Sequence, residues 1–402
     1  MYLCFGIFIA MKKKKVLIIT LPLRLNYGGI LQAYALQKIV EGLGFEVFTD
    51  NAFFLRTLSL KEKLKDFLAR FICGCIKGDD KYKPLIKKRL KRKDYEKVAK
   101  NILPFIAENI KTIDFFEGKR YPKQKNTENF DIFICGSDQV WRRKYADVRR
   151  YFFDFLNGTG KIRFSYSASF GIDDLSEYSL KEKQDCKQLI KTFSAISVRE
   201  KQAMEIIKTE FDQEAVLTLD PTLLLTKEDY INLINKRDPS LYVNENENLF
   251  VYVLDKTTEK KELKNLLLRR LNLQLCEIMP QKDWKNLSSK DIDQNAIYPS
   301  VEQWLKGFET AKFILTDSFH AVVFAIIFNK PFLCIGNKER GLSRLNSLLE
   351  MFGMQNRMIY GKKDLTGILL HDIYKIDYQT INSKKETLKQ ISLDFLKQNL
   401  GV

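Results

Sequence analysis

Several patterns are missing from this chain, and each absence excludes a class of protein. Its 402 residues include only nine prolines and nineteen glycines, too few for a collagen-like or low-complexity architecture. The longest hydrophobic run uninterrupted by glycine or a polar residue is Ala321–Phe328, well short of the ~20 residues that span a bilayer as a helix. Histidine is limited to His320 and His371, and paired Cys-x-x-Cys motifs do not occur. We therefore expect neither a membrane-spanning helix nor a metal site.

Cysteine usage indicates a cytoplasmic protein. The seven cysteines are an odd number, and several, such as Cys135 and Cys334, lie inside apolar runs. Reduced core thiols explain this pattern better than a disulfide framework does. The chain begins with an apolar stretch that precedes a basic run, which reverses the order in a secretory signal. We expect Met11, rather than Met1, to be the natural start.

Positive charge is what the chain has in excess. It carries 67 Lys and Arg against 50 Asp and Glu, a formal net charge of +17, which predicts attraction to polyanions, anionic membrane surfaces or multiply charged small substrates. The richest stretch runs from Lys81 to Lys100. A solvated helix face is its simplest interpretation, and a peripheral contact with an anionic membrane or lipid-linked phosphates is the alternative. Nucleic acid is not an expected partner, because no recognised binding module accompanies the charge.

Short apolar runs alternate with helical periodicity along most of the chain. The opening gives strand, loop, helix and strand in succession, which is a βαβ unit. A polar, aperiodic stretch at 236–248 is the best linker candidate. Before it, we expect strands at Val16–Thr20, Phe45–Thr49, Asp131–Cys135, Ile162–Ser167, Ala195–Val198 and Val216–Leu219, and a helix over Ile30–Val40.

A second alternation of the same kind follows the linker, and two successive α/β units predict two Rossmann-like doubly wound domains facing a cleft. We place these domains at residues 11–235 and 249–402, with the C-terminal helix in the second domain or packed back on the first. The second unit is expected to hold strands at Leu249–Leu254, Leu273–Ile278, Phe313–Leu315 and Pro331–Ile335, and helices near Lys260–Leu271, Val301–Glu309, Ala321–Phe328 and Ser383–Gln398.

Ligands of open α/β sheets bind beyond the carboxyl ends of the strands, so the loops after strands are the candidate sites. The first loop leads into a helix through paired glycines, which let a ligand approach the backbone near the helix amino end. A turn that simply needs glycine is the alternative. The residues concerned are Asn26, Tyr27, Gly28 and Gly29.

The loop after Asp131–Cys135 offers groups suited to a sugar. Asp138 and Gln139 can hydrogen-bond hydroxyls, with Ser137 beside them, and Trp141 can stack on a sugar face. The alternative is a helix cap next to a partly buried tryptophan.

A candidate catalytic histidine follows the strand at Phe313–Leu315. The run Asp317, Ser318, Phe319, His320 precedes an apolar helix, so His320 lies in the first turn of a helix at the carboxyl end of a strand. The positive end of the helix lowers the pKa of an imidazole, whereas a bound dianion raises it. His320 is then a competent proton donor mainly when an anionic substrate is bound. A satisfied structural histidine is the alternative.

Cations in two further loops are candidates for a phosphate or carboxylate clamp. Lys338, Arg340 and Arg344 follow the strand at Pro331–Ile335, and a solvated loop is the alternative there. Arg199 follows the strand at Ala195–Val198, where a local ion pair with its neighbouring glutamate is the alternative.

Together these segments resemble the polysaccharide pyruvyl transferase family. Six motifs match those of the family and occur in the same order, which is far more specific than any single match. They extend over roughly residues 16–340. The chain departs from the family at Ser318, because several branches have an arginine there that grips the donor. Arg199, Lys338, Arg340 or Arg344 must then supply that charge. The matching runs are NYGGILQAYALQ at 26–37, GSDQVW at 136–141, SYSASFG at 165–171, ISVRE at 196–200, LDPTL at 219–223 and TDSFH at 316–320.

The resemblance implies a fold similar to GT-B glycosyltransferases and the transfer of pyruvate from phosphoenolpyruvate to a sugar as a cyclic ketal. The first domain would hold the acceptor, a sugar of a cell-surface polysaccharide or its lipid-linked precursor, and the second would hold the donor. His320 would be the acid, and Asp138 or Asp317 would act as base or orient the acceptor. Phosphoenolpyruvate is a co-substrate, and no cofactor is expected. A GT-B glycosyltransferase using a nucleotide sugar and a non-catalytic anion- or glycan-binding relative are the competing interpretations.

Overall fold

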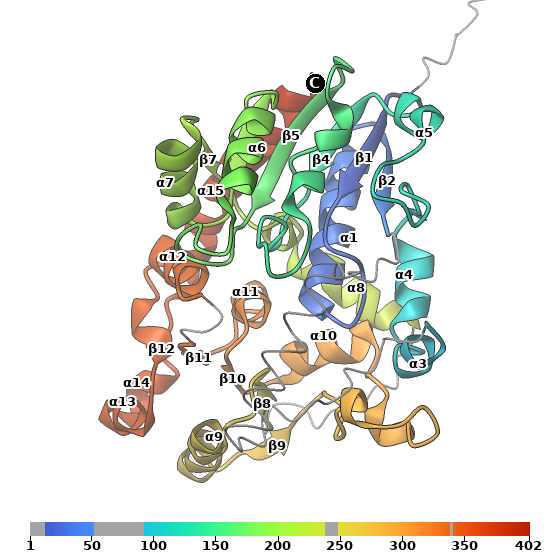
Figure 1. The fold of residues 1–402 in the computed structure, drawn as a ribbon. Coiled ribbons are helices and arrows are strands. Elements are labelled where there is room, and N and C mark those ends of the chain that lie inside the picture. The colour runs from blue at the N-terminus through green and yellow to red at the C-terminus, as the bar shows by residue number, and fades with distance from the viewer. Residues whose placement is uncertain (1–12, 52–91, 238–247, 338–340) are drawn as a thin grey trace, which may run out of the picture.

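The computed structural model describes residues 13–51, 92–237, 248–337 and 341–402 (Figure 1). Our expectations for Met11, for most of the basic stretch that begins at Lys81, and for Lys338 and Arg340 lie outside these residues. Among the helices described, none is both long and apolar enough to cross a membrane.

The first lobe is built on a parallel sheet of seven strands in the order β3-β2-β1-β4-β5-β6-β7. Its central strands are buried and rich in branched residues, as a sheet covered on both faces requires. The strand order reverses between β1 and β4, so the loops after these two strands flank the switch point where ligands bind in such sheets. The strands are β1 (Lys15–Ile19), β2 (Glu46–Asp50), β3 (Thr112–Ile113), β4 (Ile132–Cys135), β5 (Ile162–Ala168), β6 (Ala195–Val198) and β7 (Val216–Leu217).

Helices cover both faces of this sheet. Helix α1 follows β1 directly and is buried along most of its length, which explains why its apolar positions extend around the helix rather than forming one stripe. A short 3₁₀ helix, η5 (Pro221–Leu224), follows β7 and packs against α1. The helices of this lobe are α1 (Tyr27–Gly42), α3 (Arg92–Val98), α4 (Leu103–Asn109), α5 (Gln124–Glu128), α6 (Leu180–Ile190), α7 (Lys201–Phe211) and α8 (Lys227–Arg237).

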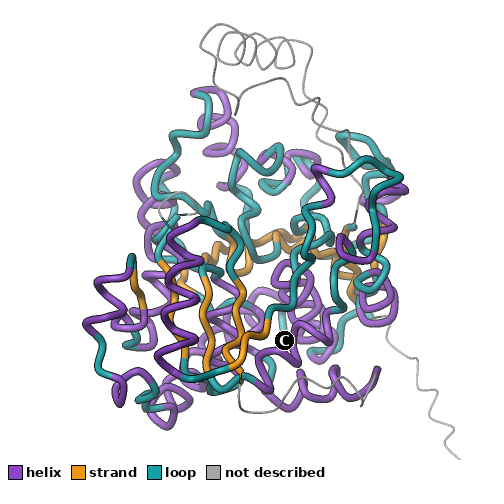
Figure 2. Tube along the Cα trace, turned by 90° about the horizontal axis from the view of Figure 1, so that it is seen from below, coloured by secondary structure: helices purple, strands orange, loops and turns teal. Residues whose placement is uncertain are grey.

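The second lobe contains a parallel sheet of five strands in the order β12-β11-β10-β8-β9, which reverses between β8 and β10. Figure 2 shows the strands of each sheet grouped between helices. Two doubly wound parallel sheets confirm the predicted fold class. The elements are β8 (Asn248–Tyr252), α9 (Thr258–Leu271), β9 (Gln274–Cys276), α10 (Val301–Thr310), β10 (Phe313–Thr316), α11 (Phe319–Ile327), β11 (Phe332–Ile335), α12 (Ser343–Phe352), β12 (Met358–Ile359), α13 (Lys362–Gly367), α14 (Leu370–Ile373) and α15 (Tyr378–Leu400).

One hydrophobic core runs through both lobes. It joins residues of the first sheet, such as Ile134, to Trp304 and Phe324 on the helices of the second lobe. Helix α15 reaches the first lobe, where the Ser392 hydroxyl accepts a hydrogen bond from the backbone N–H of Leu219 at 3.0 Å. The lobes are therefore packed together and meet with the carboxyl edges of their sheets facing each other.

Candidate active site

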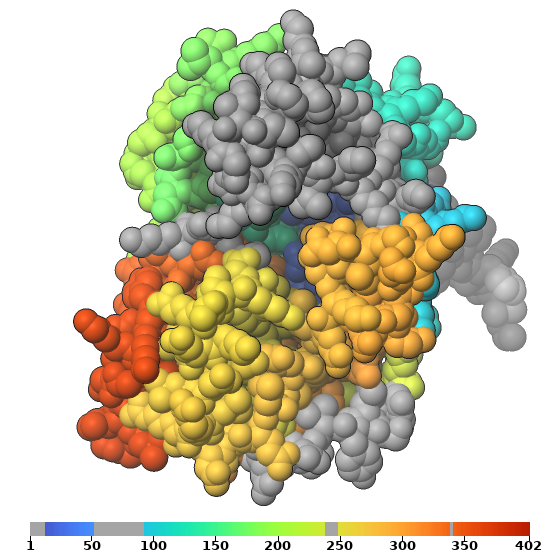
Figure 3. Space-filling view, turned by 60° about the horizontal axis from the view of Figure 1, so that its bottom comes forward, coloured from blue at the N-terminus to red at the C-terminus, as the bar shows by residue number. Residues whose placement is uncertain are grey.

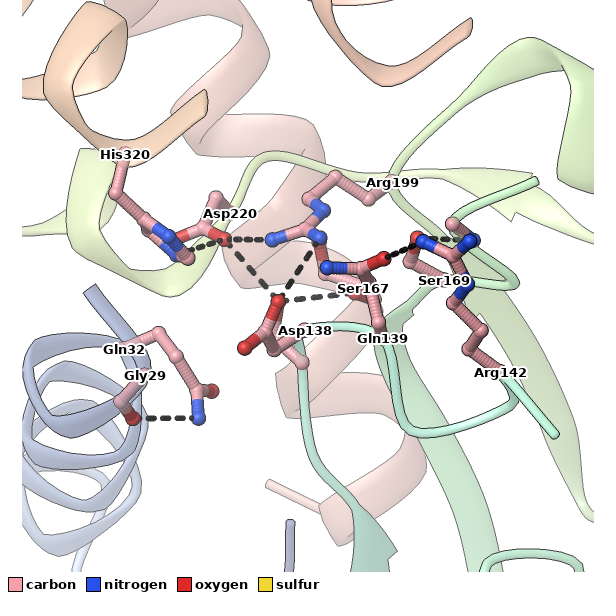
Figure 4. Close-up of polar contacts among 12 residues, drawn as sticks. Gly29, Gln32, Asp138, Gln139, Arg142, Ser167, Ser169, Arg199, Asp220 and His320 are labelled. Carbon is pink, nitrogen blue, oxygen red and sulfur yellow. Dashed lines mark hydrogen bonds and ion pairs between the residues drawn. The ribbon is translucent and has the colours of Figure 1, made fainter. Parts of the chain in front are cut away.

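A chain of buried charged groups crosses the junction between the two lobes (Figure 4). Arg199, after β6, donates from Nη1 to Asp220 Oδ2 at 2.9 Å and from Nη2 to Asp138 Oδ1 at 3.3 Å. His320, on α11 of the second lobe, places Nε2 3.5 Å from the same Asp220 oxygen. All of these residues are buried. The carboxylate of Asp220 thus links the first lobe's arginine to the second lobe's histidine.

These buried groups stabilise one another's charged forms. Burial opposes ionisation of Asp220, but its contacts with His320 and Arg199 outweigh this and hold the pKa of Asp220 well below its usual range. Burial likewise opposes the charge of Asp138, yet Arg199, His320 and Arg344 lower its pKa overall. For Arg199, the carboxylates of Asp138 and Asp220 outweigh burial and raise the pKa. Both aspartates are therefore carboxylates at neutral pH.

Gly28, the first glycine of the paired-glycine loop, lies directly against the ring of His320. A Cβ atom built on Gly28 would lie 2.1 Å from Cγ of His320, which is too close for any residue with a side chain. The histidine ring therefore rests directly on the first turn of α1. The Asn26 amide, just before that turn, donates to Asp138 Oδ2 at 3.4 Å. The need for glycine here comes from the close approach of an opposing side chain rather than from a turn.

Two residues on the first-lobe side of the site have a strained backbone conformation. Asp138 has a φ of 74° and Ser167 a φ of 51°, both in the left-handed region that non-glycine residues rarely adopt. The hydroxyl of Ser137 lies 2.9 Å from the carbonyl oxygen of Ser167 and 3.2 Å from Asp220 Oδ2. Strained residues persist where the surroundings fix them, and they cluster at functional sites.

The helices that begin at this junction are not capped by their own N-cap residues, unlike the other long helices that the structure describes, although Ser347 of α12 accepts from Lys201 N at the start of α7. The N-cap residues of α1, α7, α11 and α12 make no capping hydrogen bond. By contrast, α6, α9, α10 and α15 are capped by a side chain, and Thr226 accepts from Asp229 N at the start of α8. Two of the uncapped N-cap side chains are diverted: Asn26 reaches Asp138, and Glu200 accepts from Ser169 and the N–H of Phe170. Uncapped amino ends attract anions.

A second buried arginine stands beside the first. Arg344, in the first turn of α12, lies with its guanidinium carbon 6.0 Å from the ring centroid of Phe319, and that of Arg199 lies 4.2 Å from it. Burial, together with the charge of Arg199, lowers the pKa of Arg344 to about 10. Burial also raises the pKa of Glu200. Two like charges held close together and buried favour an anion that can contact both.

Some of the predicted site residues lie elsewhere. Both carboxylate oxygens of Asp317 are held by its own lobe: Oδ1 accepts from Leu254 N at 2.7 Å, and Oδ2 pairs with Lys260 at 2.7 Å. Trp141 is fully buried and stacks on Phe152 at 5.0 Å, so its ring has no free face for a sugar. The buried-tryptophan interpretation therefore describes this residue.

The other predicted contacts serve mainly to shape the loops. The oxygen of the Gln139 amide accepts from Arg142, and the hydroxyl of Tyr27 donates to the carbonyl of Pro299 at 2.8 Å. The carbonyl of Gly29 accepts from the Gln32 amide. Ser318 is the N-cap residue of α11 and is largely buried.

Asp220 is the site residue that sequence reasoning did not single out, although it lies within the LDPTL run. The available signal was its position directly after a predicted strand. The strand ends at Leu217, and Asp220 caps η5 by accepting from Thr222 N at 3.1 Å. A capping role and a site role are carried by different oxygens of one carboxylate.

Comparisons with known proteins place these features in a family. No curated protein matches the chain. It is similar to solved structures of Arabidopsis thaliana UGT89C1 with quercetin (10% identity, 97% of this chain and 100% of that chain, TM-score 0.49), S. aureus MnaA with UDP (14%, 96% and 97%, 0.48) and Acinetobacter baumannii MurG (10%, 96% and 99%, 0.42). The family model described as polysaccharide pyruvyl transferase matches residues 26–339, which include Asp138, Arg199, Asp220 and His320. The chain belongs to the polysaccharide pyruvyl transferase family.

Proposed function

We propose that this protein transfers pyruvate from phosphoenolpyruvate to a sugar of a cell-surface polysaccharide or its lipid-linked precursor, forming a cyclic ketal. The observation that carries the proposal is the convergence of the uncapped helices α1, α7, α11 and α12 on Arg199, Arg344 and His320. Phosphoenolpyruvate presents a phosphate and a carboxylate within a small volume. Helix amino ends and guanidinium groups are the standard partners of both anions.

Arg199 binds the donor by exchanging one of its own partners. Its contact with Asp220 is the shorter, at 2.9 Å, and its contact with Asp138 is the longer, at 3.3 Å. A donor carboxylate that displaces Asp138 keeps the charge of Arg199 paired and frees Asp138. Arg344 supplies the second guanidinium. It replaces the arginine that several branches of the family have at the position of Ser318.

The reaction adds two hydroxyl groups to one carbon and releases phosphate. His320, oriented by Asp220 and seated on Gly28, protonates the methylene carbon of the donor. The adjacent carbon becomes an oxocarbenium-like centre, and a first sugar hydroxyl attacks it while Asp138 takes its proton. A second hydroxyl then replaces phosphate, which leaves as hydrogen phosphate and carries away the second proton. A positioned acid contributes roughly 10²–10⁴-fold to such a step.

The location of the protein follows from its substrate. Phosphoenolpyruvate is a cytoplasmic metabolite, so we place the protein in the cytoplasm, with peripheral contact at the inner face of the membrane when the acceptor is lipid-linked. No cofactor enters the reaction.

Phosphate release tests the proposal. The full-length protein is incubated with phosphoenolpyruvate and a panel of acceptor sugars, and we expect sugar-dependent phosphate release. His320→Ala should lower the rate at least 100-fold with little change in melting temperature. Gly28→Ala should also lower it, because the added methyl group displaces the ring. His371→Ala is the matched control, since that histidine is 73% exposed and should leave the rate unchanged.

Two results would contradict the proposal. Release of a nucleoside diphosphate from nucleotide sugars, without phosphate release from phosphoenolpyruvate, would assign a glycosyltransferase. Stabilisation by sugars or anions in a thermal shift without any turnover would indicate a binding protein.

A further inference from the structure

The second sheet has its own switch point, and apart from His320 the residues there are not used by the reaction described above. Strand order reverses between β8 and β10, and the loops after these strands are where a ligand binds an open α/β sheet. Asp317, after β10, fixes the loop after β8 by accepting from the N–H groups of Leu254 and Asp255 at 2.7 and 3.2 Å. Lys260 neutralises its charge. Asp317 is thus the support that orients Asp255.

The carboxylate of Asp255 is paired with the side-chain amide of a neighbouring loop. Asn337, after β11, donates from Nδ2 to Asp255 Oδ2 at 2.5 Å. Both side chains are partly exposed. A carboxylate with an amide can accept from and donate to neighbouring hydroxyl groups at the same time, which a hydroxyl-rich ligand requires. Asn337 follows Gly336 on the loop after β11, whereas Asp255 lies on the loop after β8.

A rigid aromatic ring lies next to this pair. Tyr360, directly after β12, is 53% exposed. A Cβ atom built on Gly336 would lie 2.5 Å from its ring, so the ring rests on the glycine backbone. The N–H of Tyr360 is fixed by Asp364 at 2.7 Å. An aromatic group held in place and half exposed offers apolar area at little entropic cost.

The position of these residues favours a ligand that enters between the lobes. Their strands end at the edge that faces the first lobe, since Gly341, farther along the loop after β11, contacts the carbonyl of Gly171 after β5. Figure 3 shows blue and teal segments of the first lobe visible behind the yellow and orange segments of the second lobe.

We propose that Tyr360, Asp255 and Asn337 form a subsite for a neutral pyranose ring of the acceptor. The apolar C–H face of the sugar packs on Tyr360, and adjacent hydroxyls bond to the carboxylate–amide pair. This assignment rests on the proposed function for the identity of the acceptor, but it requires no turnover. It places part of the acceptor on the second lobe, beside the strand that leads to His320.

Ligand-observed saturation-transfer NMR on the full-length protein tests the subsite with a panel of methyl hexopyranosides as probes. At least one probe should receive saturation from the wild type. The signal should fall at least fivefold in Tyr360→Ala and in Asn337→Ala. Tyr121→Ala is the matched control, because Tyr121 is a similarly exposed tyrosine, at 47%, on the first lobe.

The outcome is separable from that of the phosphate assay. Saturation that is lost in Tyr360→Ala but kept in His320→Ala supports the subsite even if phosphoenolpyruvate proves not to be the donor. Saturation that is equal in the wild type and Tyr360→Ala overturns the subsite, as does a panel with no binder, even if the protein releases phosphate.

Discussion

The two edges of the junction between the lobes differ in chemistry: one is packed with buried aromatic rings, and the other is held by exposed polar groups. Where α1 meets α10, Tyr27 is fully buried and stacks on Trp304 at 5.3 Å, and the rings of Tyr252 and Tyr298 each lie 6.4 Å from that of Tyr27. Where α7 meets α12, the contacts are polar. Lys201 pairs with Glu350 at 2.9 Å, and both side chains are at least half exposed. Figure 1 shows α11 between these edges.

This difference assigns different tasks to the two edges. Buried aromatic packing is strong and tolerates no water, so the edge at Tyr27 sets how the lobes sit against each other. Exposed ion pairs contribute little and exchange readily with water. Because Arg199 precedes α7 and Arg344 lies in the first turn of α12, the two arginines of the site lie at the more weakly held of the two edges.

The largest effect is expected at the aromatic edge. Trp304 is fully buried against Tyr27, Phe308 and Phe324. Trp304→Ala should lower the free energy of unfolding by about 3–5 kcal/mol, through lost burial and the cavity that remains. Urea denaturation followed by circular dichroism measures this. A loss below about 1 kcal/mol would show that the aromatic edge does not hold the lobes together.

The elements of the fold were largely predictable, because parallel strands buried on both faces leave short apolar runs. The edge strands Thr112–Ile113 and Met358–Ile359 were not predicted, since two residues carry no periodicity. Helix α11 begins at Phe319 rather than at Ala321. His320 lies in the first turn of this helix, as its position directly after a strand predicted.

The site was predictable as a set of loops but not as a set of contacts. Sequence position located Asp138, Arg199 and His320, because each follows the carboxyl end of a predicted strand. That position can be read without knowing how the strands are arranged in the sheet. It could not show that Asp317 turns to its own lobe, or that Trp141 is enclosed by phenylalanines. Pairing across the lobes depends on packing between segments far apart in the chain, as when Gly28 receives His320.

Substitution of Asp220, which lies between the two edges, is expected to lower the free energy of unfolding by an intermediate and pH-dependent amount. Asp220→Asn keeps the shape of the side chain but removes a carboxylate bonded to Arg199, so it should cost about 1.5–3 kcal/mol at pH 7. The pKa of Asp220 is lowered by folding, so its contribution is complete above the unfolded value of about 3.9 and is lost as the pH falls toward the folded value. The gap between wild type and variant should therefore narrow below about pH 4. Urea midpoints at pH 7 and pH 3.5 measure it, and a gap that widens on acidification would contradict this assignment.

The smallest effect is expected at the polar edge, and it is the sharpest test of the comparison. Glu350→Gln removes the ion pair with Lys201 while leaving the hydrogen bond from Lys201 N to Ser347 at 3.1 Å. Because both charges are exposed, the free energy of unfolding should change by less than about 1 kcal/mol. The change should vanish in 1 M salt, where the screening length is about 3 Å. Lys208→Gln, which removes the exposed pair with Glu214 at 3.7 Å away from the junction, is the control. A loss at Glu350 comparable to that at Trp304 would mean that both edges bind the lobes equally, and that the side of the site with Arg199 and Arg344 is held as firmly as the aromatic side.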